Sequence, residues 1–383
     1  VAIMHRVTDS YGPIPYSKMQ NGTFSVPYDS QRDVYMAMID DLDAAMETLY
    51  TFASAGDGIL MRDFDISSFK GDSRLWVSFA NTLKLRMAIR MSGVEPEARR
   101  IAEEAVRDMA TYGLIDANAE NLSFSSDSRQ NPFYTQATST SWQDLRSNAS
   151  IVMYMNAYED PRRASYFSKS GYDGIYVGVR AGIQNVTPTD YATYSYPLFA
   201  EKDPVPVMYA SESWFLRAEG ALLGWTMGDT AENLYNTGVK TSLELWGNGS
   251  SYETYIASET APALSYADPR NKHNVSDFGT AVSVKWADDG NELERIITQK
   301  WIANHMIGHE AWADVRRTGY PRLLQVVNNL SGGMWGNVDS SKGMRRLHYP
   351  QSEYDNNREN VLRGVELLGG SDLHGTDVWW AKK

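Results

Sequence analysis

The sequence predicts a mainly α-helical protein in which antiparallel helix pairs support a long irregular region. Two observations lead to this fold class. Apolar residues recur every three or four positions through residues 28–113 and again through 208–247, which is the period of an amphipathic helix. Residues 118–206 are instead rich in Ser, Thr, Asn, Gly and Tyr and show no sustained period. We therefore expect long loops with short strands there, in a chain treated as one domain over 1–383.

Three helices are expected within residues 28–113. The first follows Tyr28 and Asp29, with Asp29 as a good N-cap, and the second begins at Ser73 and stops near Gly93. The third runs from about residue 95 to 112, with Met109 facing inward, and ends at a glycine, Gly113. The second helix has cations in its C-terminal half, where the helix dipole favours them: Lys84, Arg86 and Arg90.

Residues 208–247 read as two helices joined at Gly228 and Asp229. Small residues at the crossing and the short turn are typical of a helical hairpin of tetratricopeptide type, and residues 73–112 have the same design. Each hairpin leaves an apolar face that needs a neighbour. Elsewhere we expect one helical interlude between Trp142 and Ala157, one helix from Glu292 to about Thr318, and an irregular C-terminal segment over 330–383.

Composition excludes several classes of function. The chain has 36 Lys and Arg against 48 Asp and Glu, a formal net charge of −12, which argues against a nucleic-acid partner. It has no cysteine, so disulfides, cysteine-based zinc sites, iron–sulfur clusters and thiol nucleophiles are excluded, although the compartment is not fixed. Apolar runs such as Ile151–Met155 are far shorter than the ~20 residues of a membrane span. Because the chain starts at Val1 and reads there like the interior of a sequence, we expect that an upstream leader was removed.

Enzymatic motifs are not evident. His305 and His309, with Glu310 beside them, would share one helix face, but the order of residues required of a zinc hydrolase is missing and no third ligand is apparent. Glu310 and Asp314 would lie on the same helix as Arg316 and Arg317, which favours salt-bridged scaffolding over a catalytic carboxylate pair. No phosphate-binding, dinucleotide-binding or nucleophile-elbow motif occurs, so we predict a protein without catalytic residues, metal or cofactor.

Aromatic residues make up 12% of the chain, and they favour a binding function. Rings can stack on the apolar faces of sugars while amide, carboxylate and guanidinium groups take the hydroxyls. Most rings pack in cores or loops, and no spacing rule selects a binding platform. We assign to the core the rings on expected helix faces: Trp76, Trp214, Trp225, Trp301 and Trp312. The candidate ligand-binding residues lie in the irregular regions: Tyr134, Trp142, Asp144, Asn148, Tyr172, Tyr176, Trp286 and Trp335.

A family resemblance rests on three motifs near residue 300. They are Gln299-Lys300-Trp301-Ile302-Ala303, Glu310-Ala311-Trp312-Ala313-Asp314 and Arg316-Arg317-Thr318-Gly319-Tyr320-Pro321. Together they closely resemble the signature of the SusD/RagB family of Bacteroidetes outer-membrane lipoproteins. Supporting matches in the family's order span nearly the whole chain, among them Ile14-Pro15-Tyr16-Ser17, Asp160-Pro161-Arg162 and Ala218-Glu219-Gly220-Ala221.

The resemblance implies a SusD-like α/α superhelix and a function without catalysis. Such proteins are tethered to the cell surface by a lipidated cysteine and act as lids on a SusC-like TonB-dependent importer, to which they pass glycans or, in some members, peptides. Family chains begin with that cysteine and a helical stretch, neither of which is present in this sequence, and we expect that this part was removed by truncation or processing. The leading hypothesis is therefore a glycan-binding subunit of an importer, with peptide binding as the alternative and a carbohydrate-active enzyme as a third class. The ligand itself is not indicated by the sequence.

Overall fold

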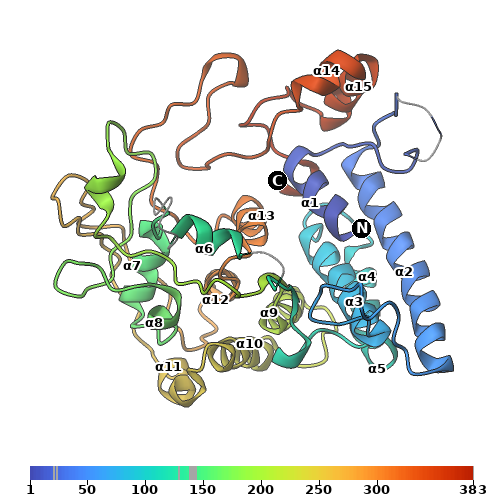
Figure 1. The fold of residues 1–383 in the computed structure, drawn as a ribbon, viewed down its shortest axis with the longest axis horizontal. Coiled ribbons are helices and arrows are strands. Elements are labelled where there is room, and N and C mark those ends of the chain that lie inside the picture. Colours follow the sequence, from blue (N-terminus) through green and yellow to red (C-terminus); the bar gives the residue numbers. More distant parts are fainter. Residues whose placement is uncertain (20–21, 23–24, 128–129, 138–144, 383) are drawn as a thin grey trace.

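The computed structural model describes residues 1–383 except 20–21, 23–24, 128–129, 138–144 and 383, and it confirms the mainly helical fold class (Figure 1). Of the described residues only a few form strands, β1 (Leu122–Phe124) and β2 (Val205–Met208), which pair antiparallel. The helices are α1 (Ala2–Tyr11), α2 (Gln31–Ala55), α3 (Ser73–Arg90), α4 (Ala98–Arg107), α5 (Met109–Tyr112), α6 (Pro132–Ala137), α7 (Ala149–Ala157), α8 (Arg163–Tyr166), α9 (Ala210–Leu222), α10 (Ala231–Leu245), α11 (Tyr252–Ile256), α12 (Glu292–Ala303), α13 (Gly308–Thr318), α14 (Gln351–Asn356) and α15 (Arg358–Leu368).

Helices α3 and α9 contact each other, and each packs against several further helices. Helix α3 contacts α2, α4 and α9, and α9 contacts α10 and α12, so both expected helix pairs pack as hairpins. Asp72 caps α3 by accepting hydrogen bonds from the backbone N–H groups of Arg74 and Leu75. Nearly every residue of α3 is buried, which makes it a core helix and not the amphipathic helix that its apolar stripe predicted.

The three cations of α3, expected where the helix dipole favours them, each form an ion pair with another helix. Lys84 pairs with Asp43 of α2 at 2.6 Å, Arg86 with Glu212 of α9 at 2.7 Å, and Arg90 with Asp9 of α1 at 2.8 Å. All three cationic side chains are buried, and buried charges need such partners. The pairs therefore join α1, α2 and α9 to α3.

Two helix boundaries differ from the prediction. The N-cap of α2 is Ser30, whose hydroxyl accepts from the N–H of Asp33. Asp29 instead accepts hydrogen bonds from the backbone of Tyr16 and Ser17. Residues 95–112 form two helices, α4 and α5, because the chain turns at Asp108, and Met109 is consequently 38% exposed instead of facing inward.

The helix expected over residues 292–318 is broken into α12 and α13. Residues 304–307 leave the helix, and Met306 has a φ of 71°, in the left-handed region. His305 lies in this break and stacks on Tyr166 with 4.0 Å between ring centroids, while His309 lies in the first turn of α13. The two histidines therefore do not share a helix face, and that prediction was wrong.

The irregular regions contain more helix than expected. Between residues 118 and 206 the structure has α6, α7 and α8 in place of one helix, and residues 142–144 of the expected interlude lie outside the described part of the chain. The C-terminal segment expected to be irregular contains α14 and α15, which lie beside the α1–α2 end of the molecule (Figure 1). Long loops over residues 167–204 and 257–291 surround α7 and α8 and build the side of the molecule opposite α2 (Figure 1).

The assignment of five tryptophans to the core is confirmed in part. Trp380, from the segment expected to be irregular, is the one fully buried tryptophan among the described residues. The five assigned to the core are half-buried at its edge, and Trp225 lies beyond the end of α9. Of these five, the structure packs four against the main core: Trp76, Trp214, Trp225 and Trp301. Each of these four indoles thus covers an edge of the hydrophobic core and remains partly exposed to solvent.

Candidate ligand-binding site

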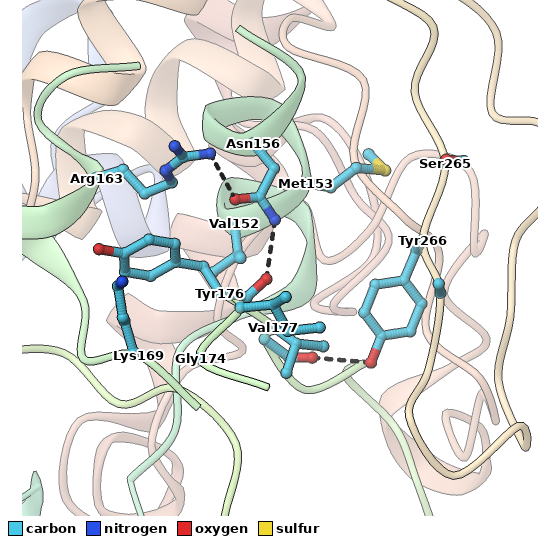
Figure 2. A pocket seen from close by; sticks show the side chains of 13 residues that line it. Val152, Met153, Asn156, Arg163, Lys169, Gly174, Tyr176, Val177, Ser265 and Tyr266 are labelled. Carbon is cyan, nitrogen blue, oxygen red and sulfur yellow. Dashed lines mark hydrogen bonds between the residues drawn. The ribbon is translucent and has the colours of Figure 1, made fainter. Parts of the chain in front are cut away.

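A cavity of about 510 Å³ lies among α7, the start of α8 and two loops, residues 169–178 and 265–267 (Figure 2). Helix α7 provides one wall through Val152, Met153 and Asn156, which its helical period brings to the same side. Asn148 sets the start of this helix, since its side chain accepts a hydrogen bond of 2.8 Å from the N–H of Ser150. The other lining residues are Arg163, Lys169, Gly174, Ile175, Tyr176, Val177, Gly178, Ser265, Tyr266 and Ala267.

Three polar side chains of this cavity form one unit. The side-chain amide of Asn156 donates to the carbonyl oxygen of Tyr176 at 2.9 Å and accepts from Nη1 of Arg163 at 3.1 Å. The guanidinium of Arg163 lies over the Tyr176 ring, 5.0 Å from its centroid. The phenol of Tyr266 donates to the carbonyl of Gly178 at 2.8 Å (Figure 2). The contacts of Asn156 and Arg163 hold the half-buried Tyr176 ring and the Arg163 guanidinium at fixed positions.

Gly178 brings the loop close to α7. A Cβ atom at this position would lie 2.6 Å from the backbone carbonyl carbon and oxygen of Asn148. The neighbouring Val179 pairs with Asn148 in an isolated parallel bridge. Only glycine allows this close backbone approach, and the approach sets where Tyr176 and Val177 enter the cavity wall.

A second cavity, of about 630 Å³, contains Trp286 and is rich in charged residues. The indole of Trp286 donates to Asp288 at 3.0 Å, and its ring lies 5.5 Å from that of Tyr235. A hydrogen bond from Arg295 lowers the pKa of Asp289, whereas burial raises the pKa of Glu294. The charged lining residues are Glu259, Lys285, Asp289, Glu294 and Arg322.

The structure does not bring the predicted ligand-binding residues around one cavity of the described chain. Tyr176 lines the first cavity and Trp286 the second. Asn148 is the cap of α7, and Tyr172 packs edge-on against Tyr194 with 5.5 Å between centroids. Tyr134 is half-buried in α6, and Trp335 stacks on His348 with 3.4 Å between centroids. Trp142 and Asp144 lie outside the described residues.

Sequence reasoning missed the polar residues that accompany Tyr176. Asn156 lies in a helix whose remaining residues are mostly apolar, and Arg163 directly follows the Asp160-Pro161-Arg162 motif. That motif explains the buried Arg162–Asp160 ion pair at 2.6 Å, but its pattern says nothing about the next residue. Tyr266 comes from a loop far along the chain, and no local signal links it to α7.

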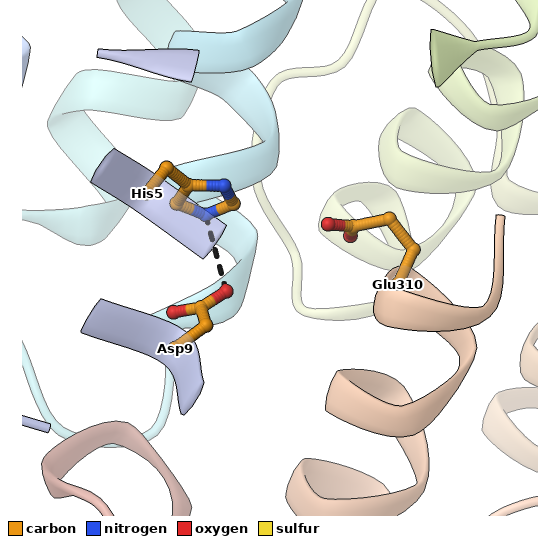
Figure 3. A group of neighbouring side chains, drawn as sticks. All are labelled: His5, Asp9 and Glu310. Atoms are coloured by element: carbon orange, nitrogen blue, oxygen red, sulfur yellow. Dashed lines mark ion pairs between the residues drawn. The ribbon is translucent and has the colours of Figure 1, made fainter. Parts of the chain in front are cut away.

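A buried cluster of His5, Asp9 and Glu310 has the composition of a metal site, with candidate ligand atoms within 4.8 Å of one another (Figure 3). Arg90 contacts both carboxylates, Asp9 at 2.8 Å and Glu310 through its other terminal nitrogen. Arg86 and Arg90 lower the pKa of Glu310, and burial lowers the pKa of His5 to about 4. The two acids are thus neutralised by arginine, and this arrangement is a buried ion-pair network joining α1, α3 and α13.

The helical hairpins and their surrounding loops place the chain in a class of proteins with a tetratricopeptide-like helical scaffold. The sequence profile of the SusD-like family, described as Susd and RagB outer membrane lipoprotein, matches residues 1–381, and the chain belongs to this family.

The Arg-Arg-Thr-Gly motif at the end of α13 has a structural role, since Arg317 pairs with Glu219 of α9 and with Asp314. In the described part of the chain no helix is long and apolar enough to cross a bilayer.

Solved structures of the family superpose closely. A chitin-binding SusD homologue from Flavobacterium johnsoniae has a TM-score of 0.91 at 40% identity, covering 99% of this chain and 78% of that protein. A SusD homologue from Bacteroides uniformis has a TM-score of 0.90 at 42% identity, with coverage of 99% and 79%. A SusD-like protein from Bacteroides thetaiotaomicron has 0.88 at 40% identity, again with 99% and 79%. The comparison with curated proteins finds no match.

Proposed function

We propose that this protein is a lipid-anchored, surface-exposed glycan-binding protein that captures oligo- or polysaccharides and delivers them to a SusC-like TonB-dependent importer. The observation that carries the proposal is 40% identity over 99% of the chain to a chitin-binding SusD homologue. Membership of an outer membrane lipoprotein family supports the location. We infer delivery of the glycan to an importer from the resemblance to the SusD/RagB family.

The first cavity is our candidate for the glycan site. It combines the half-buried Tyr176 ring with the amide of Asn156, the guanidinium of Arg163 and the hydroxyl of Ser265, a mixture that suits a sugar's apolar face and its hydroxyls. Modest affinity is expected, because sugar hydroxyls exchange hydrogen bonds with water for similar ones with protein. We propose no catalytic step. The carboxylates weighed from the sequence, Glu310 and Asp314, are engaged in buried ion pairs with Arg90 and Lys300.

Calorimetry with plant, host and microbial polysaccharides, chitin oligosaccharides and peptide pools tests this proposal. We expect binding of at least one glycan, weakened by Tyr176→Ala and unchanged by Phe64→Ala, which removes a ring that is 79% exposed and lines neither cavity. If only peptides bind, the glycan proposal fails. Co-purification with a TonB-dependent transporter from detergent extracts of cells making the native lipoprotein tests the importer separately.

Peptide binding is the second candidate, and the second cavity favours it. Glu294 lines that cavity together with the Trp286 ring, and this combination would suit a basic peptide. The other two lining carboxylates, Glu259 and Asp289, are paired with Lys285 and Arg295. Titration with lysine-rich and glutamate-rich peptides of equal length distinguishes this candidate. Preference for the lysine-rich peptide, lost in Glu294→Gln and Trp286→Ala, would support it over the glycan proposal.

A further inference from the structure

The described linings of the two cavities differ in charge, with cations alone in the first and charges of both signs in the second. The described lining of the first cavity includes two cations, Arg163 and Lys169, and no carboxylate. The second cavity has three carboxylates and two cations among its lining residues, and two of these carboxylates are paired, Glu259 with Lys285 at 2.6 Å and Asp289 with Arg295 at 3.0 Å. In a chain with 48 acidic and 36 basic residues, a cavity with cations alone is a local reversal of the overall charge.

The two cations of the first cavity keep much of their capacity to bind a ligand. Among the described residues, Arg163 donates one hydrogen bond from its guanidinium, to Asn156, although a guanidinium has five N–H donors. Lys169 is exposed and forms no ion pair within the described chain. In the view of Figure 2 the two side chains lie on opposite sides of the Tyr176 ring. The nearby carboxylates in sequence, Glu159 and Asp173, are exposed and do not line the cavity.

We infer that the first cavity is a subsite for a sugar with an anionic substituent, a carboxylate or a sulfate, attracted by the two cations that flank the Tyr176 ring, Arg163 and Lys169; this inference rests on the proposed glycan-binding function. The fork of donors on Arg163 matches the oxygens of such a group, and Lys169 adds a flexible point charge. Asn156 fixes Arg163 in position, so little of its mobility remains to be lost on binding. The substrate class is therefore acidic oligosaccharides.

Matched ligand pairs test the inference by calorimetry on the full chain. The carboxylate pair is a galacturonate tetrasaccharide and its fully methyl-esterified, neutral form. The sulfate pair is a carrageenan tetrasaccharide and its desulfated form. We expect the acidic member of at least one pair to bind about tenfold more tightly than the neutral member, and which pair responds identifies the group. Raising the salt from about 0.1 M to about 1 M should remove most of this preference.

Four variants, one of them a control outside the cavity, test whether the acidic preference arises in this cavity. Lys169→Gln should weaken acidic-ligand binding about threefold to tenfold and leave the neutral ligand unchanged, while Lys169→Arg should retain the acidic preference. Lys342→Gln removes the charge of an exposed lysine that lines neither cavity, and it should have no effect. The double variant Arg163→Gln/Lys169→Gln should bind both members of a pair equally.

The possible outcomes test the anionic subsite and the proposed glycan-binding function separately. Equal binding of acidic and neutral members, or an acidic preference that survives the double variant, would overturn the anionic subsite and leave glycan binding intact. Binding of tetraglutamate as tightly as the acidic sugar would reduce the site to a general anion attraction and also overturn the inference. Failure of every sugar, neutral or acidic, would refute the proposed function itself.

Discussion

Arg86 of α3 and Glu212 of α9 form a two-point ion pair in the protein interior, with Nε to Oε1 at 2.7 Å and Nη2 to Oε2 at 2.8 Å. Both side chains are almost completely buried. The second carboxylate near Arg86 belongs to Glu310, 3.5 Å from Nε, and Glu310 also contacts Arg90. Helices α3, α9 and α13 are thus linked through one charged network.

Replacing one partner of this pair should destabilise the fold strongly. Glu212→Ala leaves Arg86 with an incomplete set of buried partners, and the expected loss is about 3–5 kcal/mol in the free energy of unfolding. Urea denaturation, monitored by tryptophan fluorescence, measures this change in the free energy of unfolding. The double variant Arg86→Met/Glu212→Leu should recover part of the loss, since well-packed apolar residues can replace a buried pair. A change within about 0.5 kcal/mol for Glu212→Ala would contradict the account of the network.

Acid should begin to weaken the fold near pH 6.5, well above the ordinary pKa values of Asp and Glu. Burial lowers the pKa of His305 from 6.5 to about 3 and that of His5 from 6.5 to about 4, so both are neutral in the folded protein. The unfolded chain binds a proton at each histidine below its ordinary pKa, and the folded chain does not. The free energy of unfolding should therefore fall as pH drops from 6.5 toward 4, by up to about 1.4 kcal/mol per pH unit for each histidine.

The variant His305→Phe isolates one of these contributions. Its ring can keep the stacking on Tyr166 but cannot take a proton in the unfolded chain. Urea denaturation at several pH values should show a smaller slope for His305→Phe than for the wild-type protein between pH 6.5 and 4. Identical slopes would mean that His305 is protonated in the folded state.

The close approach at Gly178 should be sensitive to one added methyl group. In Gly178→Ala the new Cβ meets the backbone of Asn148 at 2.6 Å, so the loop must move away from α7. We expect a loss of about 1–3 kcal/mol in stability and weaker ligand binding at the first cavity. Gly93→Ala is the matched control, because a Cβ there meets nothing within 4 Å. Unchanged ligand binding in Gly178→Ala would show that the contact between Gly178 and Asn148 does not shape the first cavity.

The helical scaffold was largely predictable because its signals are local. The period of apolar residues located α3 and the α9–α10 hairpin to within a few residues, and Gly113 marked a helix end through its φ of 76°. The break between α12 and α13 was not predictable, since Met306 adopts a left-handed conformation that nothing in its sequence neighbourhood requires. Helices α14 and α15 were missed because few of their residues face the core.

The candidate site was less predictable because it depends on contacts between distant segments. Tyr176 and Trp286 were singled out as rings in irregular segments, yet the structure places them in different cavities. Asn156 and Tyr266 meet at one cavity although they lie on a helix and on a distant loop. A charge reversal such as that at Arg163 and Lys169 becomes visible only when the lining residues are known in space.

Isothermal titration of the full chain with a panel of glycans, comparing the wild-type protein with Tyr176→Ala, tests the central claim most directly. Our account predicts that at least one oligosaccharide binds without being hydrolysed, and that Tyr176→Ala weakens this binding about fivefold or more while the folded structure is retained. Binding of peptides but of no glycan, or turnover of a bound glycan by the pure protein, would contradict it.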